Sequence, residues 1–224
     1  IVSVALLAAC GSDDAGSTDG APDGPRVVVT TSILGDVVSN LVGDLATVEV
    51  VMPPGASPHE FQASAQQAAA MREAGVLVVN GGGFEEGLLD TIEAAESDGV
   101  ATFEAMSATE PLEFGAAGHA HDDEHAADEH ADEEHADEEH AEGEHVHEGD
   151  DPHFFTDPAR MVTVAEALVE FLVEHLDIAA DTLRAQAEDY LGQLRALDAG
   201  VEETLAPIPA ENRILVTNHE VFGY

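Results

Sequence analysis

Short runs of β-branched residues alternate with longer amphipathic stretches in the first half of the sequence. The apolar runs cover residues 27–32, 46–52, 76–80 and 100–105, and stretches with helical spacing lie between them at residues 33–43 and 63–75. Strands that alternate with helices are typical of a mostly parallel sheet covered by helices. The sequence therefore predicts an α/β lobe.

Two longer helices are predicted after residue 150. Residues 159–176 form the first, and an apolar stripe with spacings of three and four predicts the second over residues 179–206 (Leu183, Ala187, Tyr190, Leu194, Leu197, Val201 and Leu205). Such a helix would be about 40 Å long, enough to cross a whole molecule. Pro207 and Pro209 end it, and residues 213–218 predict a further strand.

An insertion rich in histidine and acids separates these halves. Residues 116–151 hold eight histidines and sixteen acids (the histidines are His119, His121, His125, His130, His135, His140, His145 and His147). A histidine recurs every fifth residue over residues 125–145, and that period spirals around a helix instead of marking one face. We expect a disordered, surface-exposed insertion.

The charge balance narrows the class of partner. The 224 residues include 47 acids and six basic residues, which gives a formal net charge of −41. Phosphate backbones would be repelled, so nucleic acid is excluded as a partner and cations are the natural ligands. A solvated acidic surface would explain part of the same imbalance.

The first 25 residues predict a lipid anchor. Residues 1–9 have the character of a signal-peptide tail, and residues 10–25 have the composition of a flexible linker. A lone cysteine is often just buried or free, but Cys10 directly follows the apolar run, and residues 7–10 resemble a bacterial lipobox. We expect a lipoprotein outside the cytoplasm, anchored through Cys10 to the bacterial cell membrane.

Three histidines outside the insertion lie at strand or loop ends beside Pro, Asn or Asp. They are His59, His153 and His219. Alone, each is more typical of a turn residue or a partly buried polar group than of a metal ligand. Their long separations match no short metal motif.

Four ordered segments give these histidines a common interpretation. They are PPGASPH at residues 53–59, Asn80-Gly81 followed by Glu85 or Glu86, DPH at residues 151–153 with Asp157-Pro158, and VTNH at residues 216–219 with FGY at residues 222–224. Together they resemble the successive signatures of the zinc/manganese-binding lipoproteins of bacterial ABC importers. The resemblance runs from Arg26 to Tyr224, and zinc-type members often carry an acidic, histidine-rich insertion at this place.

The resemblance implies a two-lobed α/β protein with metal bound between the lobes. It implies an N-terminal lobe over residues 26–178, a rigid linker helix over residues 179–206 and the start of a C-terminal lobe over residues 207–224, with the rest of that lobe missing from the sequence. His59 and His153 would be ligands from the first lobe and His219 from the second, while a fourth ligand would lie beyond Tyr224. Phe154, Phe155, Phe222 and Tyr224 are expected in the core or the pocket wall, not as ligands.

These inferences predict a monomeric binding protein that captures Zn²⁺ and delivers it to an ABC permease in the cytoplasmic membrane. Three imidazoles favour Zn²⁺, whereas Mn²⁺ prefers shells richer in oxygen. The insertion histidines would be accessory metal ligands. Three alternatives remain: a manganese-specific member of the family, a zinc-dependent hydrolase, and a metal-buffering or adhesive surface protein in which the repeat is the functional part.

Overall fold

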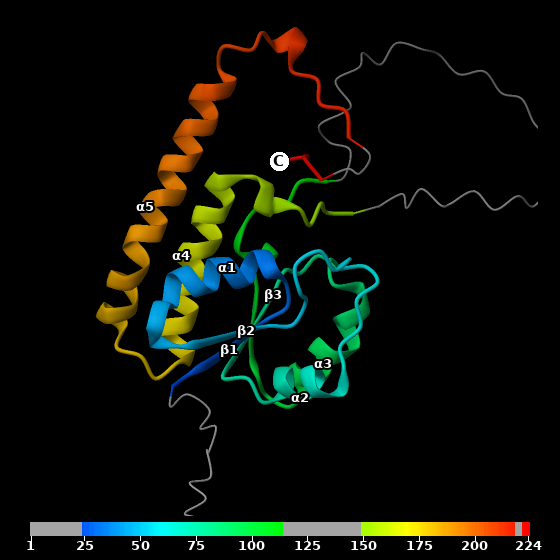
Figure 1. Ribbon diagram of the computed structural model, residues 1–224, viewed down its shortest axis with the longest axis vertical. Helices are drawn as coiled ribbons and strands as arrows, with labels where there is room; N and C mark the ends of the chain where they lie inside the picture. Colours follow the sequence, from blue (N-terminus) through cyan, green and yellow to red (C-terminus); the bar gives the residue numbers. More distant parts are fainter. Residues whose placement is uncertain (1–23, 114–148, 218–220) are drawn as a thin grey trace, which may run out of the picture.

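The computed structural model describes residues 24–113, 149–217 and 221–224 (Figure 1). Cys10, His219 and the eight histidines of the insertion lie outside these ranges. Asp151, which the sequence placed at the end of the insertion, is already buried, with 2% of its surface exposed.

A four-stranded parallel sheet forms the centre of the fold, as the sequence predicts. Its strands lie in the order β2-β1-β3-β4 (β1 Arg26–Val29, β2 Thr47–Val50, β3 Val76–Val79, β4 Ala101–Glu104). Val27 of β1 pairs with Val48 of β2 on one side and with Val76 of β3 on the other. β2 lies on one side of β1, and the chain then crosses to add β3 and β4 on the other side. The carboxyl ends of β1 and β3 therefore form the topological switch point of the sheet.

Helices cover both faces of the sheet. They are α1 Ser32–Val42, α2 Ala65–Arg72, α3 Leu89–Ser97, α4 Pro158–His175 and α5 Ala180–Leu205, with short 3₁₀ turns at Gly43–Leu45, Glu86–Leu88, Met106–Ala108, Phe154–Thr156 and Ala210–Asn212. Val27 and Val29 point into a core shared with α1, α4 and α5, whereas Val28 points into a second core shared with α2 and α3. This alternation produces the three-layer arrangement seen in Figure 1.

Side-chain caps fix where several helices begin. Thr31 caps α1 by accepting a hydrogen bond from the backbone of Leu34, and Ser64 forms a capping box with Gln67 at the start of α2. Asp157 caps α4, whose first residue is Pro158. These caps fix the points at which the loops before α1, α2 and α4 end.

The long helix α5 is confirmed, but only its first half is packed on the lobe. Leu183, Ala187 and Leu191 are buried, and Arg184 and Arg195 form ion pairs with acids of α4. Further along, Leu197 and Leu205 are 55% and 49% exposed. Figure 1 shows this second half extending past the N-terminal end of α4. Among the described residues, the apolar stripe is therefore covered by the lobe in the first half of α5 and exposed in the second half.

The strand predicted at residues 213–218 is wrong for the part that the structure describes. Residues 213–217 have no regular secondary structure, and Ile214, Leu215 and Val216 are 79%, 68% and 87% exposed. No strand within the described ranges lies beside them, and an extended segment becomes a strand only when its backbone groups pair with a neighbour.

None of the helices described here combines the length and the apolar content that a membrane span requires.

Candidate metal centre

Two of the three predicted ligands lie in loops at the carboxyl-terminal edge of the sheet. His59 lies in a turn that follows β2, and His153 immediately precedes the 3₁₀ turn Phe154–Thr156, on the chain that follows β4 and the insertion. In open α/β sheets this edge is where ligands bind. Both imidazoles therefore lie at the edge of the sheet where a ligand site is expected.

Phe84 brings the two histidines together. Its ring centroid lies 6.1 Å from that of His59 and 5.6 Å from that of His153, with both imidazoles at steep angles to the phenyl plane. Phe84 itself is only 7% exposed, and Phe155 packs against both Phe84 and His153. Residues separated by 94 positions thus lie around one apolar ring.

Asp151 fixes His153 at two points. Its Oδ1 accepts the backbone N–H of His153 at 2.9 Å and lies 2.6 Å from the ring Nδ1. Both side chains are buried, His153 being 3% exposed. Since an ionised carboxylate only accepts hydrogen bonds, Nδ1 carries the proton in the neutral imidazole, and Nε2 carries the lone pair suited to a metal.

His59 has the same kind of partner in a more exposed setting. Its Nδ1 lies 3.0 Å from Oε1 of Glu86, and the two side chains are 28% and 56% exposed. The sequence left Glu85 and Glu86 open as the acid of this segment. The structure separates them: Glu86 faces His59, whereas Glu85 points into the protein.

Three glycines turn the chain between β3 and these acids. Gly81, Gly82 and Gly83 all have positive φ angles, of 85°, 61° and 74°, which residues with a Cβ rarely adopt. A Cβ on Gly81 would also collide with the side chain of Glu104. This turn returns Phe84 and the acids to the edge of the sheet.

Glu85 links the two strand ends that form the topological switch point of the sheet. Its Oε1 accepts hydrogen bonds from Thr30 Oγ1 at 2.5 Å and from the backbone of Asn80 at 2.6 Å, joining the ends of β1 and β3. Burial raises the pKa of Glu85 above its ordinary value, because the charged form is poorly solvated there. The side chain of Asn80 in turn donates to the carbonyl of Pro152, next to His153.

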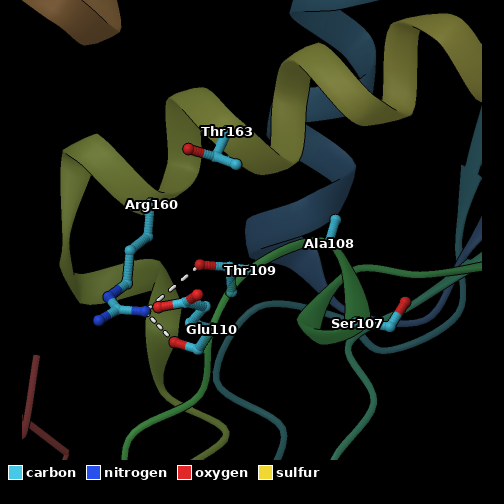
Figure 2. Close-up of a pocket in the computed structure, with 6 residues that line it drawn as sticks. All are labelled: Ser107, Ala108, Thr109, Glu110, Arg160 and Thr163. Atoms are coloured by element: carbon cyan, nitrogen blue, oxygen red, sulfur yellow. Dashed lines mark hydrogen bonds between the residues drawn. The ribbon is translucent and has the colours of Figure 1, made fainter.

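A separate pocket lies at the start of α4 (Figure 2). It is lined by Ser107, Ala108, Thr109, Glu110, Arg160 and Thr163. It contains no imidazole, and the guanidinium of Arg160 would repel a metal cation. This pocket is therefore not the site that the predicted ligands His59 and His153 would form.

Within the ranges that the structure describes, no three His, Cys, Asp or Glu side chains are grouped so that they could hold a metal ion. Of the three predicted ligands, the described ranges include His59 and His153 but not His219. Sequence reasoning missed Phe84 and gave Asp151 no role beyond its motif. Phe154 is buried as expected, whereas Phe222 is 56% exposed and so is not a core residue here.

Comparison with known proteins identifies the family. The family model described as "Zinc-uptake complex component A periplasmic" matches residues 27–224. The manganese-binding lipoprotein MntA of Halalkalibacterium halodurans is 28% identical over 225 residues, which is all of this chain and 64% of that protein. The iron-binding protein YfeA of Yersinia pestis is 28% identical over 200 residues, or 89% of this chain and 55% of that protein.

Solved structures show the same fold. Zn(II)-bound AdcA from Streptococcus pneumoniae matches with a TM-score of 0.69 and 22% identity, over 90% of this chain and 36% of that one. Because the family model covers residues 27–224, the chain belongs to this family of non-catalytic solute-binding proteins. The hydrolase alternative is therefore wrong. The chain spans less than two thirds of the length of each of these relatives.

Proposed function

We propose that this chain captures a divalent metal, with Zn²⁺ as its substrate, and delivers it to an ABC importer from outside the cytoplasm. One observation carries the proposal: His59 and His153 both pack against Phe84, each with a carboxylate on Nδ1. A carboxylate behind an imidazole is the usual partner of a histidine that binds metal through Nε2. His219 would supply the third nitrogen.

The choice of zinc rests on donor chemistry. Three imidazole nitrogens suit Zn²⁺, and the harder Mn²⁺ prefers a shell rich in oxygen. The relatives named above are described as binding manganese, iron or zinc, so the family alone supports only a divalent metal. A manganese-specific protein is the second candidate, favoured by the similarity to the manganese-binding lipoprotein of H. halodurans.

Metal titration of single variants tests this function. We expect the parent chain to bind one zinc ion tightly and manganese less tightly, and His59→Ala, His153→Ala and His219→Ala each to lose the tight zinc site. His175→Ala is the matched control, since His175 lies at the far end of α4 and stacks on Phe171. His219→Glu should narrow the gap between zinc and manganese because it hardens the shell. Equal affinities in the parent would favour the manganese candidate.

The remaining parts of the proposal concern residues outside the described ranges. We propose that Cys10 carries a lipid anchor and that an ABC permease is the partner of the metal-loaded protein. Partition of the cellular protein into a detergent phase, lost on Cys10→Ala, is the expected result for the anchor. The insertion histidines would act as accessory ligands, and a surface role in buffering or adhesion would be secondary to transport.

A further inference from the structure

The last residues of the chain return to the loop that carries His153. The phenol oxygen of Tyr224 donates a hydrogen bond to the carbonyl of Asp151 at 2.5 Å and accepts one from the backbone N–H of Leu112 at 3.1 Å. Leu112 and Asp151 are themselves joined, since the N–H of Asp151 donates to the carbonyl of Leu112 at 2.6 Å. Tyr224 therefore completes a three-way junction of residues far apart in the sequence.

Arg160 packs against the Tyr224 ring at this junction. Its guanidinium carbon lies 4.5 Å from the centroid of the Tyr224 ring, within the range of a cation–π contact. The guanidinium is already held by Thr109 Oγ1 at 3.3 Å and by the carbonyl of Glu110, as Figure 2 shows, and by Asp157 Oδ2 at 3.4 Å. The Tyr224 ring therefore packs on a guanidinium that other residues already hold in place.

The backbone before Tyr224 also packs on Asp151. A Cβ on Gly223 would come within 2.5 Å of Asp151 Oδ2. Because Oδ1 of the same carboxylate holds His153, one side chain contacts both the histidine and the returning segment. Any displacement of residues 221–224 would remove neighbours of the carboxylate that orients His153.

We propose that Tyr224 is a positioning residue for metal binding, which holds residues 221–224 against Asp151, the carboxylate that orients His153, and so slows release of the ion. This inference rests on the proposed function. Tyr224 would act through Asp151, without touching the metal. Its hydroxyl is the group that carries the effect, because the hydroxyl makes both junction hydrogen bonds.

Tyr224→Phe isolates that hydroxyl, since it keeps the ring over Arg160. We expect zinc to dissociate about 3- to 10-fold faster from this variant into excess chelator, in line with the loss of one or two hydrogen bonds. Tyr190→Phe is the control: Tyr190 lies on α5 and packs against the core of the lobe, away from the junction. We expect its release rate to match that of the parent.

A measurement without metal separates this inference from the proposed function. Exchange of the Leu112 amide hydrogen in the metal-free chain should be faster in Tyr224→Phe than in the parent, and unchanged in Tyr190→Phe. Faster exchange with an unchanged rate of zinc release would overturn the positioning role while leaving the proposed function intact. Unchanged exchange would overturn the junction itself. A parent chain that binds no zinc tightly would instead refute the proposed function, and with it this inference.

Discussion

One oxygen of Asp151, Oδ1, contacts both the backbone amide and the ring Nδ1 of His153, at 2.9 Å and 2.6 Å. Because both residues are almost fully buried, water competes little for these contacts. The imidazole is therefore oriented before any ligand arrives. A site built in this way loses less conformational entropy on binding than one whose ligands must first be ordered.

Neutralising this carboxylate should weaken metal binding without unfolding the lobe. We expect Asp151→Asn to lower zinc affinity by about 10- to 100-fold, the usual cost of altering the partner of a metal-binding histidine. Competition with a chelating dye would measure the change. Asp150→Asn is the matched control, because Asp150 is adjacent but exposed.

The equivalent change at His59 should have a smaller effect. Glu86 is 56% exposed, so water can replace it as the acceptor for Nδ1, and Glu86→Gln should cost less affinity than Asp151→Asn. Glu60→Gln, at an exposed acid next to His59, controls for the loss of one charge. An effect of Glu86→Gln as large as that of Asp151→Asn would show that burial of the carboxylate does not set its contribution.

The stability of the lobe should depend on pH through Glu85. Burial raises the pKa of Glu85 in the folded state above its ordinary value of 4.5, so the folded protein holds this proton more tightly than the unfolded chain. The resulting stabilisation is present below pH 4.5 and is lost as the pH rises through the folded-state pKa. Denaturant titrations at a series of pH values would measure it.

Glu85→Gln is the variant that reveals this dependence, because a glutamine resembles the protonated acid and does not titrate. The free energy of unfolding of the parent, relative to that of Glu85→Gln, should fall as the pH rises from below 4.5. Subtracting the variant removes the contribution of the many other acids. A difference that stays constant with pH would show that Glu85 keeps its ordinary pKa in the fold.

Helix α5 should contribute to stability mainly through its first half. Leu183→Ala removes a fully buried side chain and should cost about 2–5 kcal/mol of unfolding free energy, partly through the cavity that it leaves. Leu197→Ala is the same change on the same helix at a residue that is 55% exposed, and it should cost within about 0.5 kcal/mol. Similar costs at both positions would mean that the second half is covered in solution.

Deleting residues 118–149 should remove weak zinc sites and preserve the tight one. Glu113 and Asp150 form an antiparallel bridge, so the remaining residues 114–117 can close the gap as a short connection. The sequence predicts that this insertion is disordered, so each of its metal sites would have to be ordered at about 1–2 kcal/mol per residue of backbone and should be weak. Calorimetric titration should show fewer zinc equivalents. Loss of the tight site in the deletion, with its retention in His59→Ala, would make the repeat the primary site.

Much of the lobe could be predicted from the sequence because its signals are local. The β-branched runs at β1 and β3 and the apolar stripe of α5 each reflect the periodicity of one element. The strand predicted at residues 213–218 is absent from the described residues 213–217, because an apolar run says nothing about whether a pairing partner is present. Local signals therefore predicted elements well and their partners poorly.

The site followed a different pattern. His59 and His153 could be proposed as ligands because their segments, together with the other two, resemble the ordered signatures of a family, although neither histidine would stand out alone. Phe84 could not be predicted, because the property that matters is its contact with two residues that are distant from each other in the sequence. The different roles of Glu85 and Glu86 likewise could not be predicted. They depend on the glycine turn, after which Glu85 points into the protein and Glu86 towards His59.

The most direct test of the central claim is the anomalous scattering of zinc in crystals of the metal-loaded chain. We expect one strong peak about 2.0–2.1 Å from Nε2 of both His59 and His153, with a nitrogen of His219 as the third ligand. The carboxylates of Asp151 and Glu86 should remain on the Nδ1 atoms. A strong peak that lies elsewhere, with neither His59 nor His153 among its ligands, would contradict the claim.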